Sequence, residues 1–66
     1  MQVINEVDDQ GVPPLVSVVK IGNADVCQLL LERGADINMV EEDTNRSAVF
    51  YAITVKHLDI LEILLK

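Results

Sequence analysis

The side chains best suited to chemistry are carboxylates, and they gather in two short stretches. The first stretch reads INEVDD from Ile4, and the second reads INMVEED from Ile37, 33 residues later. The two stretches hold six of the eleven carboxylates: Glu6, Asp8, Asp9, Glu41, Glu42 and Asp43. Such clusters can bind a metal ion or act in general acid–base catalysis. A calcium loop needs alternating oxygen ligands around a central glycine and a distal glutamate, an order that neither DDQG nor EEDTN has. We therefore expect solvated turn tips that form an acidic rim, and no metal site.

Cys27 and His57 are the other candidates for chemistry, because each is the only residue of its type. A Cys–His pair acts as nucleophile and base only when the two side chains lie within hydrogen-bond reach. We interpret Cys27 instead as a small core hydrophobe within the apolar stretch VCQLLL. The chain has no glycine-rich phosphate loop, no Ser–His–Asp set and no CxxC pair. We predict that it is not an enzyme and needs no cofactor.

Composition narrows the partners that the chain can bind. Its net charge is −6, which disfavours nucleic acid and anionic membrane surfaces. No apolar run approaches the roughly 20 residues that a membrane span needs. A single cysteine cannot form an internal disulfide, so we expect a reducing compartment, the cytoplasm or the nucleus. A protein partner with a basic or apolar segment fits this charge best.

The two carboxylate stretches belong to an internal repeat. Ile4–Asp9 aligns with Ile37–Glu42 at a spacing of 33, and one extra residue in EEDTN makes the spacing 34 afterwards. At this second spacing the aligned pairs are Leu15 with Val49, Val19 with Ile53, Asp25 with Asp59, and Leu29–Leu31 with Ile63–Leu65. Repeats of this period pack as solenoids, because one unit alone cannot bury its apolar face.

Each repeat divides into a polar turn, a short apolar stretch, a tight turn and a longer helix. The apolar stretches, PPLVSVVKI and SAVFYAITV, have helical spacing, although their β-branched residues leave a strand as the rival. Pro13 and Pro14 favour a helix start, and Ser47 can cap the corresponding helix. Gly34 lies where a helix C-terminus is expected. The short turns predict antiparallel helices within each pair.

These residues resemble the ankyrin repeat, whose pattern is roughly D-x-x-G-x-T-P-L-H-x-A-A-x-x-G-x-x-x-V-V-x-L-L-L-x-x-G-A-D-x-N. The matching residues are Gly11, Pro14, Leu15, Gly22, Leu29–Leu31 and Gly34–Asn38. The resemblance implies an all-α, ankyrin-type α-solenoid of two stacked antiparallel helix pairs joined by hairpin-like turns. It places the tail of a preceding repeat at 1–7, a first repeat at 8–40 and a truncated, degenerate second repeat at 41–66.

The chain departs from the ankyrin pattern at several positions. Pro13 and Val16 replace the Thr and His whose hydrogen bonds support the family's TPLH turn. In the second repeat, Asn45 and Lys56 replace glycines, and a left-handed Lys56 would cost about 1 kcal/mol. Both ends of the stack would expose leucine-rich faces without capping repeats. We therefore expect a fragment of a longer array, with self-association through the uncapped ends as the rival.

By this resemblance, the chain is a non-catalytic protein–protein interaction module that binds through the concave face made by the hairpin tips and the first helices. The contacting positions that match the family are Val7, Asp9, Gln10, Val12, Lys20, Ile21, Val40, Glu42, Arg46, Thr54 and Val55. The extra residue in EEDTN shifts the assignment of Glu42 by up to one position. Two alternatives stay open. These repeats could be structural spacers whose valines only pack repeat against repeat, or a regulatory segment of a larger enzyme or channel.

Overall fold

A computed structural model describes residues 4–65 of the 66-residue chain. It contains four α-helices: α1 (Pro14–Ile21), α2 (Ala24–Glu32), α3 (Ala48–Thr54) and α4 (Leu58–Leu64). Within the described residues the only β-type pairing is an isolated bridge between Val40 and Ser47. The all-α prediction is confirmed, and both apolar stretches are helices and not strands. None of the helices in this part of the chain has the length and apolar character to cross a membrane.

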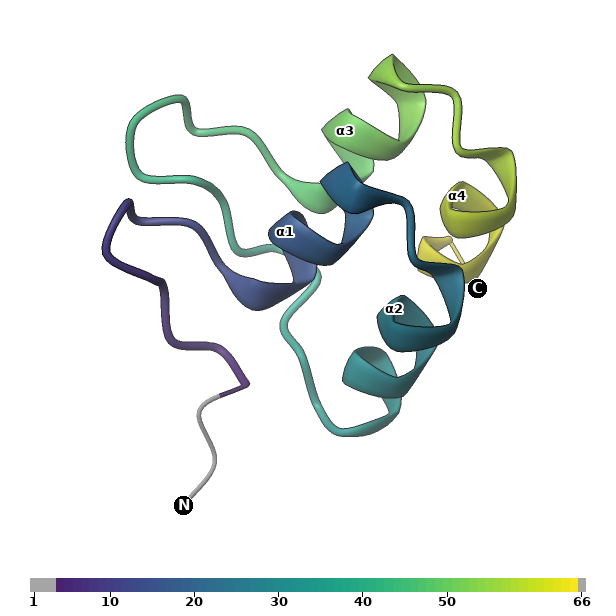
Figure 1. Ribbon diagram of the computed structural model, residues 1–66, viewed down its shortest axis with the longest axis horizontal. Helices are drawn as coiled ribbons and strands as arrows, with labels where there is room; N and C mark the ends of the chain where they lie inside the picture. Colours follow the sequence, from purple (N-terminus) through teal and green to yellow (C-terminus); the bar gives the residue numbers. More distant parts are fainter. Residues whose placement is uncertain (1–3, 66) are drawn as a thin grey trace.

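The four helices form two stacked pairs. Helix α1 packs against α2 and α3, and α4 packs against α3 and α2. The loops that precede α1 and α3 project together to one side, away from α2 and α4 (Figure 1). The helices of each pair are joined by only two or three residues, which fixes them antiparallel. This is the predicted arrangement of an ankyrin-type solenoid.

Local sequence explains where the helices begin. Pro14 is the first residue of α1, where its missing N–H leaves no hydrogen bond unmade. The Asn23 side chain accepts a hydrogen bond from the Val26 N–H at the start of α2 (3.1 Å). The Ser47 hydroxyl oxygen accepts one from the Phe50 N–H at the start of α3 (3.2 Å). The predicted cap at Ser47 is therefore confirmed.

Left-handed residues follow three of the helices, α1, α2 and α3, and also occur in the hairpin turns. Gly22 follows α1 with φ 93°, and Gly34 follows α2 with φ 96°. In the second repeat, Asn45 and Lys56 take the glycine positions with φ 61° and 60°. Lys56 therefore keeps the left-handed conformation of the glycine that it replaces, the case for which a cost of about 1 kcal/mol applies.

An aliphatic core lies between the two helix pairs. Its buried members are Leu15, Val16, Val19, Cys27, Ala48, Ala52, Ile60 and Leu64. Val19 replaces a family alanine, and it is completely buried. Ala48 and Ala52 are the buried residues of the facing helix α3, and their small side chains leave room for the valines of α1.

Two further contacts hold the repeats in register. Asn5 donates from Nδ2 to the Gly34 carbonyl (3.3 Å) and accepts from the Asp36 N–H at Oδ1 (2.7 Å). The His57 ring lies under the turn of the first pair, so a Cβ atom added at Gly22 would come within 2.8 Å of its Nε2. Each contact joins segments about one repeat apart.

Candidate functional site

The first hairpin tip is closed by one carboxylate. Asp8 Oδ1 accepts hydrogen bonds from the N–H groups of Gln10 (2.8 Å) and Val12 (3.0 Å). The Gly11 N–H donates to the Asp8 carbonyl (2.9 Å), and φ at Gly11 is 77°. Asp8 therefore has a structural role, while Asp9 and Gln10 remain exposed at the tip.

The second tip carries the extra residue and lies directly against the first. The Glu41 N–H donates to the Arg46 carbonyl (2.9 Å), and the Asn45 N–H donates to the Glu41 carbonyl (2.8 Å). The Glu42 N–H donates across to the Gly11 carbonyl (3.0 Å). A Cβ atom at Gly11 would lie 2.7 Å from Glu42 Oε1, so glycine permits this approach. The two tips therefore form one continuous edge.

Glu41 contradicts the expectation of a solvated acidic tip. It is 6 % exposed, and it is the only buried charged residue in the described part of the chain. Its Oε1 atom accepts hydrogen bonds from the Tyr51 hydroxyl and from the Thr44 hydroxyl (2.7 Å). Its Oε2 atom pairs with Lys20 Nζ (3.0 Å). The carboxylate turned inward because three donors from separate segments converge on it.

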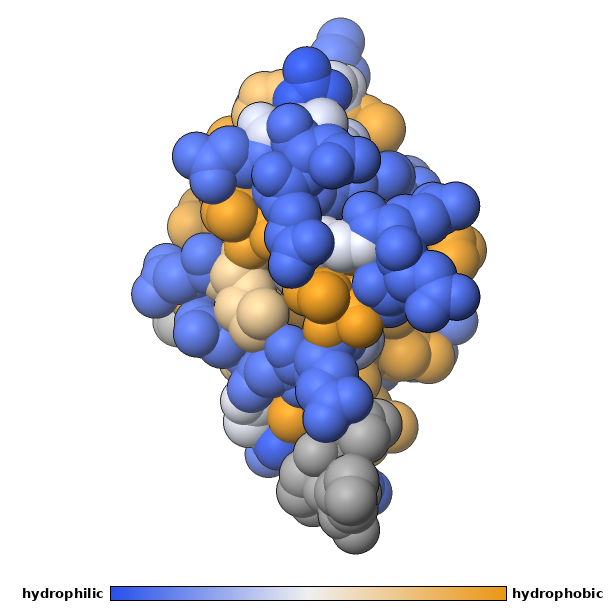
Figure 2. Space-filling model, turned by 90° about the vertical axis from the view of Figure 1, so that its left-hand side faces the viewer, coloured by the Kyte–Doolittle hydropathy of each residue, from blue (hydrophilic) through white to orange (hydrophobic). Residues whose placement is uncertain are grey.

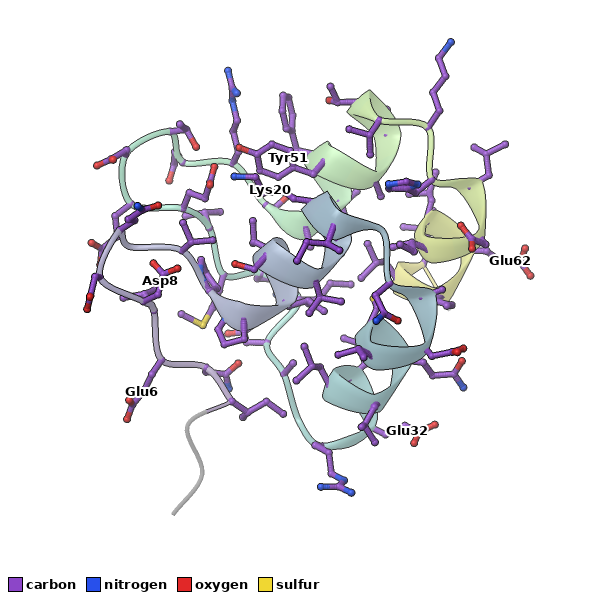
Figure 3. All side chains as sticks on the ribbon, in the orientation of Figure 1. Glu6, Asp8, Lys20, Glu32, Tyr51 and Glu62 are labelled. Carbon is purple, nitrogen blue, oxygen red and sulfur yellow. The ribbon has the colours of Figure 1, made fainter. Side chains whose placement is uncertain are left out.

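The hydrogen bonds around Glu41 also shift the pKa values of Glu41 and Lys20. The Tyr51 and Thr44 hydroxyls and Lys20 stabilise the ionised carboxylate and lower the pKa of Glu41 from 4.5 to about 2. The hydrogen bond with Glu41 raises the pKa of Lys20. Lys20 Nζ also lies 4.9 Å from the centre of the Tyr51 ring. Figure 3 shows Lys20 and Tyr51 side by side next to α1 and α3.

The two aromatic residues, Phe50 and Tyr51, extend this cluster. Their rings meet edge to face with centres 5.4 Å apart. The Arg46 guanidinium carbon lies 4.9 Å from the centre of the Phe50 ring. Neither aromatic residue was among the predicted contact positions of this face. Phe50 and Tyr51 are the only Phe and the only Tyr of the chain, and they follow Arg46 by four and five residues. This spacing, which is that of one helical turn, is the sequence feature that could have identified them.

A comparison with protein families identifies the architecture. The family model described as ankyrin repeats (3 copies) matches residues 2–66. The chain belongs to the ankyrin repeat family. No curated protein matches it. Ankyrin repeats are in general protein–protein interaction modules and are typically non-catalytic.

The predicted ankyrin contact positions differ in their exposure. The exposed ones are Asp9, Gln10, Lys20, Ile21, Glu42, Arg46, Thr54 and Val55. The half-buried ones are Val7, Val12 and Val40. Val12 packs against the core, and the Val40 backbone bridges to Ser47. These three valines offer a partner less surface than Ile21, which is 79 % exposed.

The ankyrin hairpin side of the molecule is mixed in character. Figure 2 looks onto it and shows hydrophilic groups over most of the surface, with hydrophobic groups between them. Ile21 ends α1, and Val55 caps α3 at the matching position, 34 residues later. Val55 is 44 % exposed. The face thus runs from acidic tips, past Lys20 and Arg46, to an exposed apolar pair.

The remaining candidates for chemistry in this ankyrin chain are structural. Cys27 is completely buried, as predicted for a core hydrophobe. Burial raises the pKa of its thiol, and the negative charge of Asp59 adds to the rise. His57 stands at the N-cap of α4 without a side-chain capping bond, and its ring packs under Gly22. Among the described residues, no group of three or more His, Cys, Asp or Glu side chains is placed to hold a metal ion.

Proposed function

We propose that the chain binds a protein partner through its concave face, formed by the two hairpin tips and the exposed sides of α1 and α3. The observation that carries this proposal is the exposed pair Ile21 and Val55 at matching ends of the two helices. α1 and α3 pack against each other, so these large exposed apolar groups lie on neighbouring helices, as in an interaction site. Their positions match those through which the ankyrin pattern places partner contacts.

The charge along this face sets the chemistry of the partner. Asp9 and Glu42 are exposed at the tips, where a basic side chain would meet two carboxylates. Lys20 is already paired with Glu41 and presents little free charge. The best-fitting partner segment therefore carries basic residues near the tips and apolar residues over Ile21 and Val55. A net charge of −6 further favours such a partner over nucleic acid.

A spacer role is the second candidate, because Val7, Val12 and Val40 are half-buried. Side chains that pack within the stack would serve the array and not a partner. A spacer predicts that exposed substitutions on the concave face change no binding at all. Only substitutions in the core would then have an effect.

A displayed peptide library selected on the immobilised chain separates the two functions. Ile21→Glu should abolish capture of the selected peptides, since it places a charge on the apolar end of the face. Leu29→Glu is the matched control, because Leu29 is 45 % exposed on α2 and lies outside the predicted contact positions. Circular dichroism checks that both variants stay helical. Equal capture by the chain and Ile21→Glu would contradict a binding role for this face.

The proposal extends to the cellular compartment. Cys27 is a free thiol, and it is buried. A single unpaired cysteine is typical of proteins in a reducing environment. We therefore propose that the chain acts in the cytoplasm or the nucleus, which fluorescence microscopy of the tagged chain would test.

A further inference from the structure

Lys20 and Arg46 are the two cations among the predicted contact positions of the concave face, and only one of them is neutralised. Lys20 Nζ lies 3.0 Å from Glu41 Oε2, in the only ion pair among residues 4–65. Arg46 therefore has no carboxylate partner in this part of the chain, and it is exposed. It lies between the acidic tips and the start of α3 at Ala48. A face that is acidic at its edge thus carries one unpaired positive charge further in.

The guanidinium group of Arg46 is held in place before a partner binds. Its Cζ atom lies over the Phe50 ring, 4.9 Å from the centre. The Arg46 carbonyl accepts a hydrogen bond from the Glu41 N–H (2.9 Å), and its N–H donates to the Thr44 hydroxyl oxygen (3.3 Å). An arginine fork carries its N–H donors in one plane and can bind both oxygens of a carboxylate. Because the group is already positioned, it loses less side-chain entropy on binding a carboxylate than a free side chain would.

The first repeat shows that the position of Arg46 stays accessible within a stack. Its counterpart at the spacing of 34 is Val12, which follows Gly11 in the first tip. The second tip lies directly against the first, through the hydrogen bond from the Glu42 N–H to the Gly11 carbonyl. Val12 is nevertheless only half-buried. An arginine side chain reaches further than a valine at the same position, so Arg46 stays open to a partner when another repeat packs beside it.

We propose that Arg46 determines the specificity of the concave face by binding a carboxylate of the partner segment. This inference rests on the proposed function, and it adds an acidic residue to the segment described there. The basic residues of the segment meet the tips, its carboxylate binds Arg46, and its apolar residues cover Ile21 and Val55. A basic residue in place of the acidic one would face a like charge, so the face disfavours purely basic segments.

The first step of the test is the displayed peptide library, selected on the immobilised chain. The peptides are fused through their C-termini, so Asp and Glu side chains are the only carboxylates that they offer. Peptides whose capture is abolished by Ile21→Glu should contain Asp or Glu in addition to basic and apolar residues. Peptides without any acidic residue would overturn the inference. If the chain captures no peptide, or captures the same peptides with Ile21→Glu, the proposed function fails and this inference fails with it.

A double-mutant cycle then assigns the carboxylate to Arg46. The probes are one selected peptide, labelled for fluorescence anisotropy, and the same peptide with its acidic residue changed to the amide. The amide should weaken binding to the unchanged chain by about five- to tenfold. It should weaken binding to Arg46→Gln by less than about twofold, because the group that the carboxylate binds is already absent. Arg46→Gln retains the two backbone hydrogen bonds of this residue, and circular dichroism checks that the variant stays helical.

Arg33→Gln is the matched control for the charge of the chain. Arg33 is the exposed C-cap residue of α2 and lies outside the predicted contact positions. Its replacement changes the net charge by the same amount as Arg46→Gln does. The amide should weaken binding to Arg33→Gln as much as it weakens binding to the unchanged chain. An equally large loss with Arg46→Gln, while Ile21→Glu still abolishes capture, would overturn this inference without contradicting the proposed function.

Discussion

Lys56 is the residue whose replacement gives the clearest test of the backbone geometry. It follows the C-cap of α3 with φ 60°, at the position where the first repeat has Gly22 with φ 93°. A left-handed conformation costs a non-glycine residue about 1–2 kcal/mol. Glycine adopts it freely but loses about 0.5–1 kcal/mol more backbone entropy on folding. Lys56→Gly should therefore raise the free energy of unfolding by about 0.5–1 kcal/mol.

Urea denaturation followed by circular dichroism at 222 nm measures this change. A chain this short has an m-value near 1 kcal/mol/M, so the midpoint should rise by about 0.5–1 M with m unchanged. The melting temperature should rise by about 2–8 °C. The hydrogen bond from the Lys56 N–H to the Ile53 carbonyl (3.2 Å) is retained in the glycine variant. The change in stability therefore reports the strain that is removed less the backbone entropy that glycine loses.

Matched variants show whether strain is the cause. Asn45→Gly should stabilise the chain by less than Lys56→Gly, because asparagine tolerates the left-handed region better. Gly22→Ala should destabilise it by more than about 1 kcal/mol, since strain adds to the clash of the new Cβ with His57 Nε2 at 2.8 Å. A midpoint for Lys56→Gly that stays the same or falls would refute the assignment of stored strain to this position.

Three further predictions concern the interior and the helix ends. The pKa of Glu41 is about 2 in the folded chain and 4.5 ordinarily, so its contribution to stability is complete above pH 4.5 and is lost as the pH falls toward 2. The free energy of unfolding of Glu41→Gln should therefore fall less over this pH window than that of the unchanged chain, as measured by urea denaturation at each pH. Cys27 should react with Ellman's reagent only at the rate of unfolding, because its thiol is buried and its pKa is raised; fast reaction in native buffer would contradict this. Asn23→Ala should lower the free energy of unfolding by about 1 kcal/mol through loss of the α2 cap, whereas Asn23→Ser should retain most of it.

Local backbone features were predictable from sequence because each depends on a few neighbouring residues. The Ser47 cap needs only a hydroxyl three residues before a helical N–H. The left-handed turn at Lys56 follows from its alignment with Gly22 in the other repeat. Leu29, Leu58 and Leu65 are all exposed. The internal repeat made such predictions possible, because the backbone conformation at a position in one repeat is expected at the aligned position of the other.

The inward turn of Glu41 was not predictable in the same way. In sequence, Glu41, Glu42 and Asp43 are three equivalent carboxylates in one polar loop. The partners that distinguish Glu41 are Lys20 and Tyr51, which lie 21 and 10 residues away. Which carboxylate they reach is set by the register of the second hairpin, and the extra residue in EEDTN alters that register. Only the packing of α1 against α3 brings the two donors to the same place.

The Glu41 cluster also explains how the chain manages without the family's usual turn bonds. Pro13 and Val16 remove the hydroxyl and imidazole donors that the TPLH pattern provides. The carboxylate of Glu41 instead ties the second hairpin to α3 through Tyr51, to α1 through Lys20, and to its own loop through Thr44. Because this linkage spans both repeats, it fixes the position of the acidic tips relative to Ile21 and Val55. The least exposed charged residue of the described chain therefore sets the shape of the proposed binding face.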